Sequence, residues 1–184
     1  MEKADVIVLG LGPAGASAAA EAARHGCKVI ALDRKREAGR PVQCAELVPA
    51  LLEVEAGAVR QRVGSMVTFV EDDAPHVSAD FPGRMLDRAA FDKSLVDEAA
   101  GSGAQIRFSS FVTRITAKGV VETSCGSTFQ APVIIGADGP RSRAGKAIGS
   151  VNTELVETRQ ITVGLTQPHS ATDIFLTAEI PGGY

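Results

Sequence analysis

The chain contains 184 residues, of which 45% are hydrophobic and 22% are charged, and its formal net charge is −3. These values are typical of a soluble globular protein with one domain, or with one domain and part of another. The weakly negative charge argues against a nucleic-acid-binding surface, and no apolar run approaches the roughly 20 residues that span a membrane. The three cysteines and three histidines are scattered, so the sequence predicts no metal site and indicates free cytoplasmic thiols.

The segment that begins at Val6 predicts a dinucleotide-binding turn. Four apolar residues suit a buried parallel strand, and Gly10, Gly12 and Gly15 follow at G-x-G-x-x-G spacing. In such a motif the glycines permit the turn, the approach of a pyrophosphate and close packing of the next helix, expected over residues 13–25. The positive end of that helix would hold the phosphates. The motif alone is weak evidence, because glycine-rich turns are common.

An aspartate after the next strand supports this interpretation. A strand expected over residues 28–32 ends at Asp33, close to the spacing of about 20 residues at which a carboxylate binds the adenosine ribose. The alternative is a solvated aspartate in a surface turn. Arg34 could neutralise a 2′-phosphate, but Asp33 would repel that group. A dinucleotide with a free ribose is therefore favoured.

The middle of the chain predicts a loop, a separate small sheet and a helix. Residues 34–41 are charged and irregular, and a short helix is expected over about 49–56. Strands at 66–70 and 76–81 would flank a polar turn and form a small sheet. Asp87 is a candidate N-cap for a helix that extends to about residue 100. Its expected buried face consists of Ala90, Phe91, Leu95 and Ala99.

The remaining chain predicts further strands around an acidic turn. Short apolar segments separated by glycine turns predict an antiparallel meander, and a buried strand then ends in Gly136-Ala137-Asp138-Gly139. A short helix is expected over 142–148. The expected strands are 105–108, then 112–116, 120–123 and 128–130 in the meander, then 132–135, 159–165 and 173–180.

The order of these motifs resembles the FAD-binding half of flavoproteins of the p-hydroxybenzoate hydroxylase type. The shared features are the glycine motif, Asp33, a cysteine-containing loop, an Arg-x-x-Phe-Asp helix, a meander and the Gly-Ala-Asp-Gly turn. Within that group, Pro41-Val42-Gln43-Cys44-Ala45-Glu46 and Pro181-Gly182-Gly183-Tyr184 are similar to the geranylgeranyl reductase family. The resemblance covers the whole chain. It implies an α/β fold in which a Rossmann-like FAD-binding domain, with a parallel sheet and an antiparallel β-meander, is joined to part of a mixed or antiparallel substrate-domain sheet.

The resemblance also assigns site residues, with FAD as the cofactor. Gly10, Gly12, Ala14 and Gly15 would cradle the pyrophosphate. Asp33 would hold the ribose with Arg34 beside it, Arg88 would reach the phosphate or ribose region, and the backbone of Val112 would read the adenine edge. Asp138 would lie beside the cofactor, and Cys44, Ala45 and Leu47 would lie at the flavin ring. The alternative for Arg88 is that it pairs with Asp87 or Asp92. The side chain of Val112 is expected to lie in the core, so that only its backbone would be functional.

Two positions depart from the family pattern. The loop usually reads Cys-Gly-Glu-Gly, whereas this chain has Ala45 and Leu47 at the glycine positions. The family commonly has an arginine seven residues after the acid of the Gly-Ala-Asp-Gly turn, where this chain has Gly145.

The activity that the resemblance implies is FAD-dependent reduction of isolated C=C bonds in prenyl (geranylgeranyl) chains of lipids or pigments. Cys44 is the candidate acid that protonates one alkene carbon, and its alternative role is that of a small buried residue. The electron donor would be NAD(P)H or a ferredoxin. Two other functions stay open, namely an FAD-dependent monooxygenase of the hydroxylase type and a non-catalytic flavin-binding fragment.

The resemblance further implies a discontinuous domain organisation. Residues 1–60 and 84–155 would form the FAD-binding domain, and residues 61–83 and 156–184 an incomplete substrate sheet. The family's next motif begins Tyr-x-Trp-x-Phe-Pro, and the sequence ends at Tyr184, which predicts an N-terminal fragment. We expect a cytoplasmic protein with no nucleic-acid partner; peripheral membrane contact and the oligomeric state stay open.

Overall fold

The computed structural model describes residues 1–167 and 169–179, and the chain divides into two compact units. The first unit comprises Met1–Pro41 and Asp92–Leu155. The second unit comprises Val42–Phe91 and the described part of the segment that begins at Val156.

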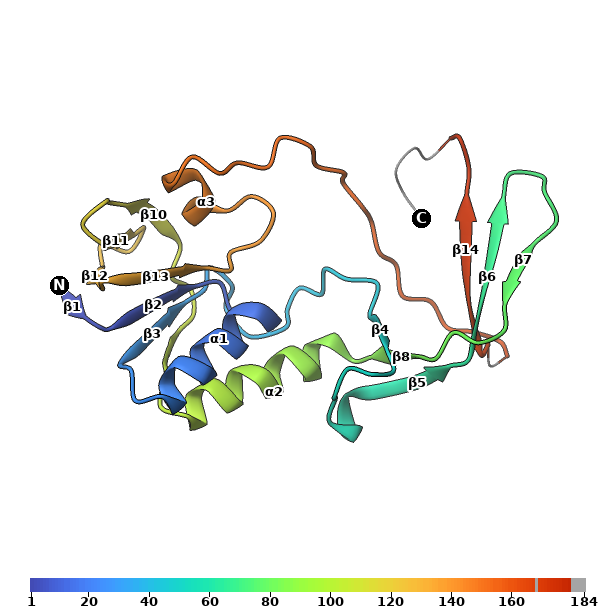
Figure 1. Ribbon diagram of the computed structural model, residues 1–184, viewed down its shortest axis with the longest axis horizontal. Helices are drawn as coiled ribbons and strands as arrows, with labels where there is room; N and C mark the ends of the chain where they lie inside the picture. The colour runs from blue at the N-terminus through green and yellow to red at the C-terminus, as the bar shows by residue number, and fades with distance from the viewer. Residues whose placement is uncertain (168, 180–184) are drawn as a thin grey trace. The chain divides into compact units, whose positions relative to one another are not determined.

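The centre of the first unit is a parallel sheet with the strand order β13-β2-β3-β9 (Figure 1). Strands β2 and β3 are apolar and buried along their whole length, as their sequences predict. Strand β13 lies at the edge, and Val133 is 48% exposed, so the expectation of a buried strand there is wrong. An edge strand has a neighbour on only one side, which leaves part of it open to solvent. The strands are β2 (Val6–Leu9), β3 (Val29–Leu32), β9 (Gln105–Arg107) and β13 (Val133–Gly136).

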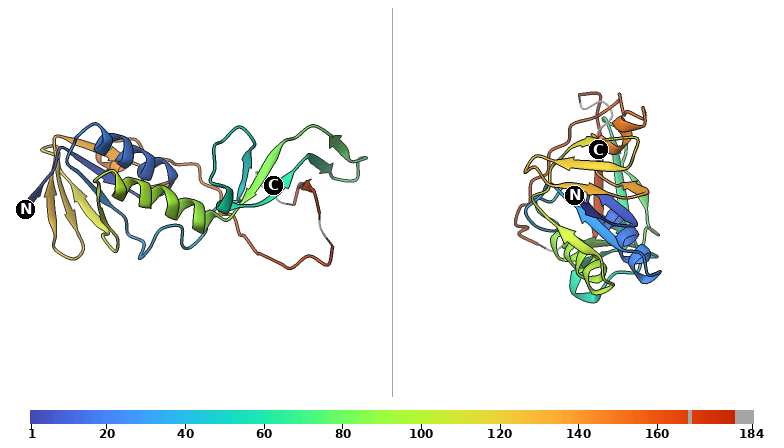
Figure 2. Two further views of the ribbon diagram at one scale, coloured as in Figure 1. Left: turned by 90° about the horizontal axis from the view of Figure 1, so that it is seen from below. Right: turned by 90° about the vertical axis from the view of Figure 1, so that its left-hand side faces the viewer.

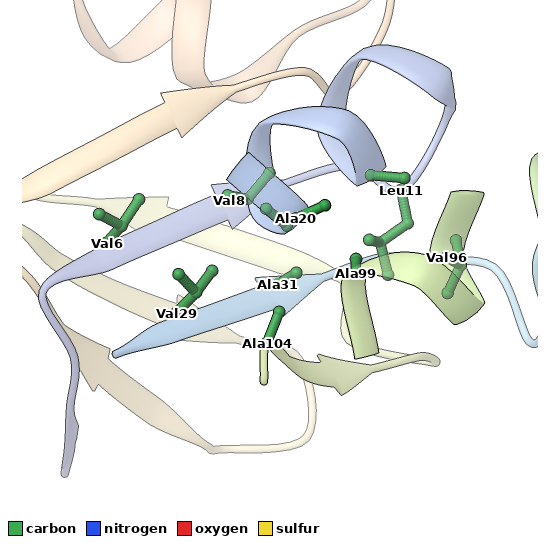
Figure 3. Packing of buried hydrophobic residues seen from close by; sticks show 11 residues of the cluster. Val6, Val8, Leu11, Ala20, Val29, Ala31, Val96, Ala99 and Ala104 are labelled. Atoms are coloured by element: carbon green, nitrogen blue, oxygen red, sulfur yellow. The ribbon is translucent and has the colours of Figure 1, made fainter. Parts of the chain in front are cut away.

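Helix α1 (Pro13–Arg24) and the part of helix α2 (Arg88–Gly101) that lies in the first unit cover one face of this sheet (Figure 1). Figure 3 shows Val8 and Ala31 of the strands beside Ala20 of α1 and Val96 and Ala99 of α2. The buried alanines of α1 let the helix approach the sheet closely. Each large aliphatic side chain buried here contributes about 1.5–3 kcal/mol to folding.

The buried face of α2 differs in part from the expected one. Ala99 is buried and Leu95 packs against the core, as expected. Asp92, Val96 and Ala99 are buried, whereas Ala90 is exposed. The pattern of apolar residues did not reveal this face because one of its buried members is a carboxylate.

An antiparallel meander covers the other face of the parallel sheet, as Figure 2 shows. Its side chains Val121 and Phe129 pack with Ile7, Leu9 and Ile30 of the sheet. This arrangement confirms the expected Rossmann-like sheet with a meander. The meander strands are β10 (Val112–Ile115), β11 (Val120–Thr123) and β12 (Thr128–Gln130), and the unexpected strand β1 (Glu2–Lys3) pairs in parallel with β12.

The second unit contains two small sheets, with the orders β4-β8-β5 and β14-β6-β7. The first is antiparallel, whereas the second is mixed because β14 runs parallel to β6. The separate sheet predicted around the polar turn is therefore present. The elements are β4 (Leu47–Pro49), η1 (Ala56–Ala58), β5 (Val59–Val63), β6 (Ser65–Val70), β7 (His76–Ser78), β8 (Gly83–Leu86) and β14 (Ala171–Leu176).

Two local predictions for the second unit are wrong. The helix expected over 49–56 does not form, because the chain up to Pro49 pairs with β8 and the Ala50 N–H donates to the Pro82 carbonyl at 3.0 Å. Residues 159–165 are irregular and exposed. Although these residues favour a β conformation, no strand pairs with them within the part of the chain that the structure describes.

The strand expected over 173–180 corresponds to β14. Its last expected residue lies outside the described residues, as do residues 181–184.

The boundaries of the compact units differ from the expected domain boundaries. Residues 42–60 and 84–91 group with the second unit by their contacts, although the resemblance placed them in the FAD-binding domain. The assignment of residues to a flavin-binding and a substrate-binding domain stays a prediction.

Candidate functional site

The glycine turn after β2 has the geometry that a dinucleotide requires. Gly10 has φ +92°, and a Cβ atom there would lie 2.2 Å from the Ala137 carbonyl oxygen. A Cβ at Gly15 would lie 1.9 Å from the Gly10 carbonyl oxygen, whereas one at Gly12 would meet nothing within 4 Å. Two glycines are therefore needed for packing inside the protein, and the third faces open space.

The open space lies at the N-terminus of α1. Gly12 is the N-cap, Pro13 opens the helix, and no side chain caps its first turn. Ala14 is exposed on this turn. The first backbone N–H groups of a helix have no intrahelical partner, and they carry its positive end. The residues present therefore fit a pyrophosphate placed above Gly12.

Asp33 is positioned at the end of β3 with both carboxylate oxygens bound to backbone amides. It is 7% exposed, and its two oxygens accept hydrogen bonds of 2.7 Å from the N–H groups of Leu11 and Lys35. The carboxylate thus ties the glycine turn to the end of the neighbouring strand. Carboxylate oxygens have further lone pairs, so Asp33 can also accept from ribose hydroxyls, and that role stays a prediction.

The Gly-Ala-Asp-Gly turn after β13 packs directly against the glycine turn. The Ala137 N–H donates to the Leu9 carbonyl at 2.7 Å, and a Cβ at Gly10 would lie 2.8 Å from the Asp138 Cα. The Asp138 carboxylate accepts from the Ser142 hydroxyl and from the Arg143 N–H at 2.6 Å. Asp138 therefore fixes the start of helix α3 (Arg143–Ala147), a role that its sequence motif did not indicate.

The first unit brings several of the predicted site residues together at one edge of the parallel sheet. Gly10, Asp33 and Asp138 each follow the carboxyl end of a strand, and those strands are neighbours in the order β13-β2-β3. Ligands of open α/β sheets bind outside such strand ends. Arg34 follows Asp33 and is exposed. The Val112 side chain lies in the core at the start of β10, as expected; a role for its backbone in binding adenine stays a prediction.

The remaining predicted residues, Cys44, Ala45, Leu47 and Arg88, belong to the second unit. The Cys44 Sγ accepts a hydrogen bond from the Glu46 N–H at 3.4 Å. Ala45 is exposed beside it, and Leu47 opens strand β4. The Arg88 N–H at the start of α2 donates to Glu46 Oε1 at 3.3 Å. Arg88 also lies over the Phe91 ring, with 6.0 Å between its guanidinium carbon and the ring centroid.

Glu46 and Gln160 are candidate site residues that sequence reasoning missed. Glu46, and neither Ala45 nor Leu47, adopts a positive φ, which is 65°. Gln160 accepts from the Cys44 N–H and donates to Glu46 Oε2, each at 3.3 Å. The similarity of the cysteine loop could have drawn attention to Glu46. No local pattern marks Gln160, because its contacts reach 114 and 116 residues back along the chain.

A hollow of about 740 Å³ also lies in the first unit, between α3 and the meander. Ile115, Ile134 and Leu155 supply apolar lining, and Arg141 and Lys146 supply positive charge. It includes none of the three motif glycines and not Asp33. The amides of the glycine turn, which fit a pyrophosphate, therefore lie outside this hollow.

Two kinds of feature, a metal-binding cluster and a membrane-spanning helix, are absent from the described residues. Residues 1–167 and 169–179 contain no group of three or more His, Cys, Asp or Glu side chains placed to hold a metal ion. Over the same residues, no helix has the length and apolar character needed to cross a bilayer.

Comparison with known proteins identifies the family. A family model described as FAD binding domain matches residues 3–173. An uncharacterized protein in the nifH2 5′ region of Methanosarcina barkeri is 36% identical over 79% of this chain and 87% of that protein. Digeranylgeranylglycerophospholipid reductase 1 of Methanococcoides burtonii is 30% identical over 98% of this chain and 50% of that enzyme.

A solved structure supports the same grouping. The crystal structure of a geranylgeranyl bacteriochlorophyll reductase-like protein from Thermoplasma acidophilum has a TM-score of 0.77 and 25% identity, over 97% of this chain and 51% of that one. This chain thus spans about half the length of these reductase relatives. The family match over nearly its whole length, together with the glycine turn and the sheet edge around it, shows that this chain belongs to the FAD binding domain family.

Proposed function

We propose that the first unit binds FAD at the glycine turn and that the protein reduces isolated double bonds in the prenyl chains of lipids. The observation that carries the site is the open space above Gly12 at the uncapped start of α1, in a turn whose Leu11 N–H donates to Asp33 and whose Gly10 packs against the Asp138 backbone. The activity is supported by the similarity to digeranylgeranylglycerophospholipid reductases. Their name indicates a substrate that combines geranylgeranyl chains with a phosphate-containing headgroup.

The chain's own residues would hold the cofactor and supply a proton. Amides of the glycine turn and of α1 would hold the pyrophosphate, and Asp33 the ribose. Bound FAD supplies the hydride for such a reduction. An isolated alkene is a poor hydride acceptor, so the second hydrogen has to come from an acid that protonates the other carbon. Cys44 is the candidate for that acid.

The partners follow from this chemistry. The substrate would be a prenylated lipid, and the flavin would be reduced by NAD(P)H or by a ferredoxin. Because the substrate chains are lipidic, we include peripheral contact with a membrane surface in the proposal and place the protein in the cytoplasm.

The test uses the full-length protein, loaded with FAD, reduced with dithionite without oxygen and given a digeranylgeranyl phospholipid. Mass spectrometry should show the gain of one H₂ for each reduced double bond. Cys44→Ser should retain FAD and lose turnover. Cys125→Ser is the matched control, because Cys125 is an exposed turn residue of the meander. If Cys44→Ser reduces the lipid at the parent rate, Cys44 only fills space.

A further inference from the structure

The backbone of the cysteine loop has an unusual conformation at Glu46. Its φ of 65° lies in the left-handed region, which glycine adopts readily and other residues adopt at a cost in free energy. In this conformation the Glu46 N–H donates to the Cys44 Sγ at 3.4 Å. Residues persist in such a region where surrounding contacts hold them, and these places are often functional sites.

The contacts that hold this loop come from two distant segments. Gln160 accepts from the Cys44 N–H with Oε1 and donates to Glu46 Oε2 with Nε2, and both distances are 3.3 Å. The other carboxylate oxygen of Glu46 accepts from the Arg88 N–H at 3.3 Å. Only a side chain with an acceptor and a donor, such as an amide, can make both of the Gln160 contacts at once.

We propose that Glu46 and Gln160 are positioning residues that hold Cys44 in place for the reaction, an inference that rests on the proposed function. We call the pair the Glu46–Gln160 clamp. Gln160 fixes the backbone amide of Cys44, while the carboxylate of Glu46 anchors the loop to the start of α2. Without the clamp, the loop is free to leave the left-handed conformation, and the sulfur loses its N–H donor.

The clamp pairs a carboxylate at position 46 with an amide at position 160. Exchanging these two side chains therefore tests it. In Gln160→Glu, two carboxylates face each other and the donor to Glu46 is lost. In Glu46→Gln, one oxygen remains for two donors, so the new NH₂ group faces either the Gln160 NH₂ group or the Arg88 N–H, and one contact is lost. The double variant Glu46→Gln/Gln160→Glu restores every contact. The amide introduced at position 46 then donates to the carboxylate introduced at position 160, and that carboxylate still accepts from the Cys44 N–H.

Two measurements on the full-length protein report on the clamp. Hydrogen–deuterium exchange of peptides that contain residues 44–46 should be about tenfold faster in each single variant and return to the parent rate in the double variant. With the prenyl lipid, kcat should fall about tenfold in each single variant with KM unchanged, and should recover in the double variant. Gln167→Glu is the matched control, an exposed residue of the same segment, and should change neither quantity.

The outcomes separate the clamp from the proposed function. If exchange at residues 44–46 is the same in the parent and the single variants, or if the double variant fails to restore it, the clamp is wrong. If exchange responds as expected but kcat does not, the positioning role is wrong. If the parent protein reduces no prenyl lipid, the proposed function fails, and the exchange cycle still decides whether the clamp exists.

Discussion

The three glycines of the nucleotide turn have different physical roles. Gly10 and Gly15 allow the turn, the helix and the Asp138 turn to pack against one another, since a Cβ at either position would overlap a carbonyl oxygen. Gly12 has an extended backbone with φ −74° and ψ −179°, which any residue can adopt. Because Gly12 has no side chain, the space outside the protein at this position stays open, and we propose that the pyrophosphate binds there.

These roles predict opposite effects of two alanine substitutions. Gly12→Ala should leave the free energy of unfolding within about 0.5 kcal/mol of the parent value, yet lower FAD affinity at least about tenfold. Gly15→Ala should destabilise the fold by about 1–3 kcal/mol or more, because the new Cβ would lie 1.9 Å from the Gly10 oxygen. Urea unfolding and calorimetry on the full-length protein measure the two quantities. Parent-like FAD binding by Gly12→Ala would contradict our placement of the pyrophosphate.

Cys125 is predicted to be the reactive thiol of the meander. Hydrogen bonds from the side chains of Ser127 and Thr123 lower the pKa of this exposed thiol to about 7. The thiolate is the reactive form, so alkylation should rise as pH increases through about 7. Ser127→Ala removes the larger cause, raises the pKa and should slow iodoacetamide labelling at neutral pH about fivefold. Peptide mass spectrometry measures this, with Cys27 as the internal reference; an unchanged rate refutes the role of Ser127.

Helix α2 has a side-chain cap at its N-terminus, which Asp87 provides. Asp87 caps it through a 3.0 Å hydrogen bond from the Ala90 N–H to Oδ1, and Oδ2 pairs with Arg60 at 2.9 Å. These two interactions, in that order, lower the pKa of the Asp87 carboxyl. Because the folded-state pKa is depressed, the ionised carboxylate stabilises the fold above its ordinary pKa. The contribution is lost as the pH falls through the lowered value.

Asp87→Ala should therefore destabilise the protein by about 1 kcal/mol at neutral pH. The difference from the parent should begin to shrink below about pH 4, where the carboxyl of the unfolded chain becomes protonated, and should be lost as the pH falls through the lowered folded-state pKa. Urea unfolding over a pH series is the measurement. Asp97→Ala on the same helix is the control, because it removes only an exposed ion pair with Lys93 and should cost less than about 0.5 kcal/mol. An equal loss at all pH values would show that the charge is not involved.

At the scale of the whole molecule, the second unit leaves apolar side chains in contact with water. Ile161, Val163 and Leu165 are 83%, 68% and 65% exposed in an irregular segment, and Phe175 of β14 is 59% exposed. Contiguous exposed apolar residues mark surfaces that bind something or cause association. The reductase relatives are about twice as long as this chain, and in them further chain is available to cover such a surface.

The exposed apolar side chains lead us to expect that the 184-residue chain associates in solution. Replacing Ile161, Val163 and Leu165 together by glutamine should reduce this association, and sedimentation measures it. A monodisperse monomeric parent chain would contradict the expectation.

The sequence by itself determined the features that depend on short stretches of chain. These features are the spacing of Gly10, Gly12 and Gly15, the two buried strands, the cap at Asp87 and the meander turns. Each depends on residues within about 20 positions of one another, and a single sequence displays such signals. The α/β class and the FAD-binding family were predicted from their order, and the fold and the family comparison confirmed both.

Tertiary structure alone decided the features that depend on distant partners. The helix expected over 49–56 did not form because the chain up to Pro49 pairs with β8 and continues into a turn. Residues 159–165 stayed irregular because β propensity forms a strand only beside another strand. Asp92 became part of the buried face of α2 although it is charged. The contact of Gln160 with Cys44 spans 116 residues, and no periodicity or motif encodes it, because its hydrogen bonds exist only once the chain has folded.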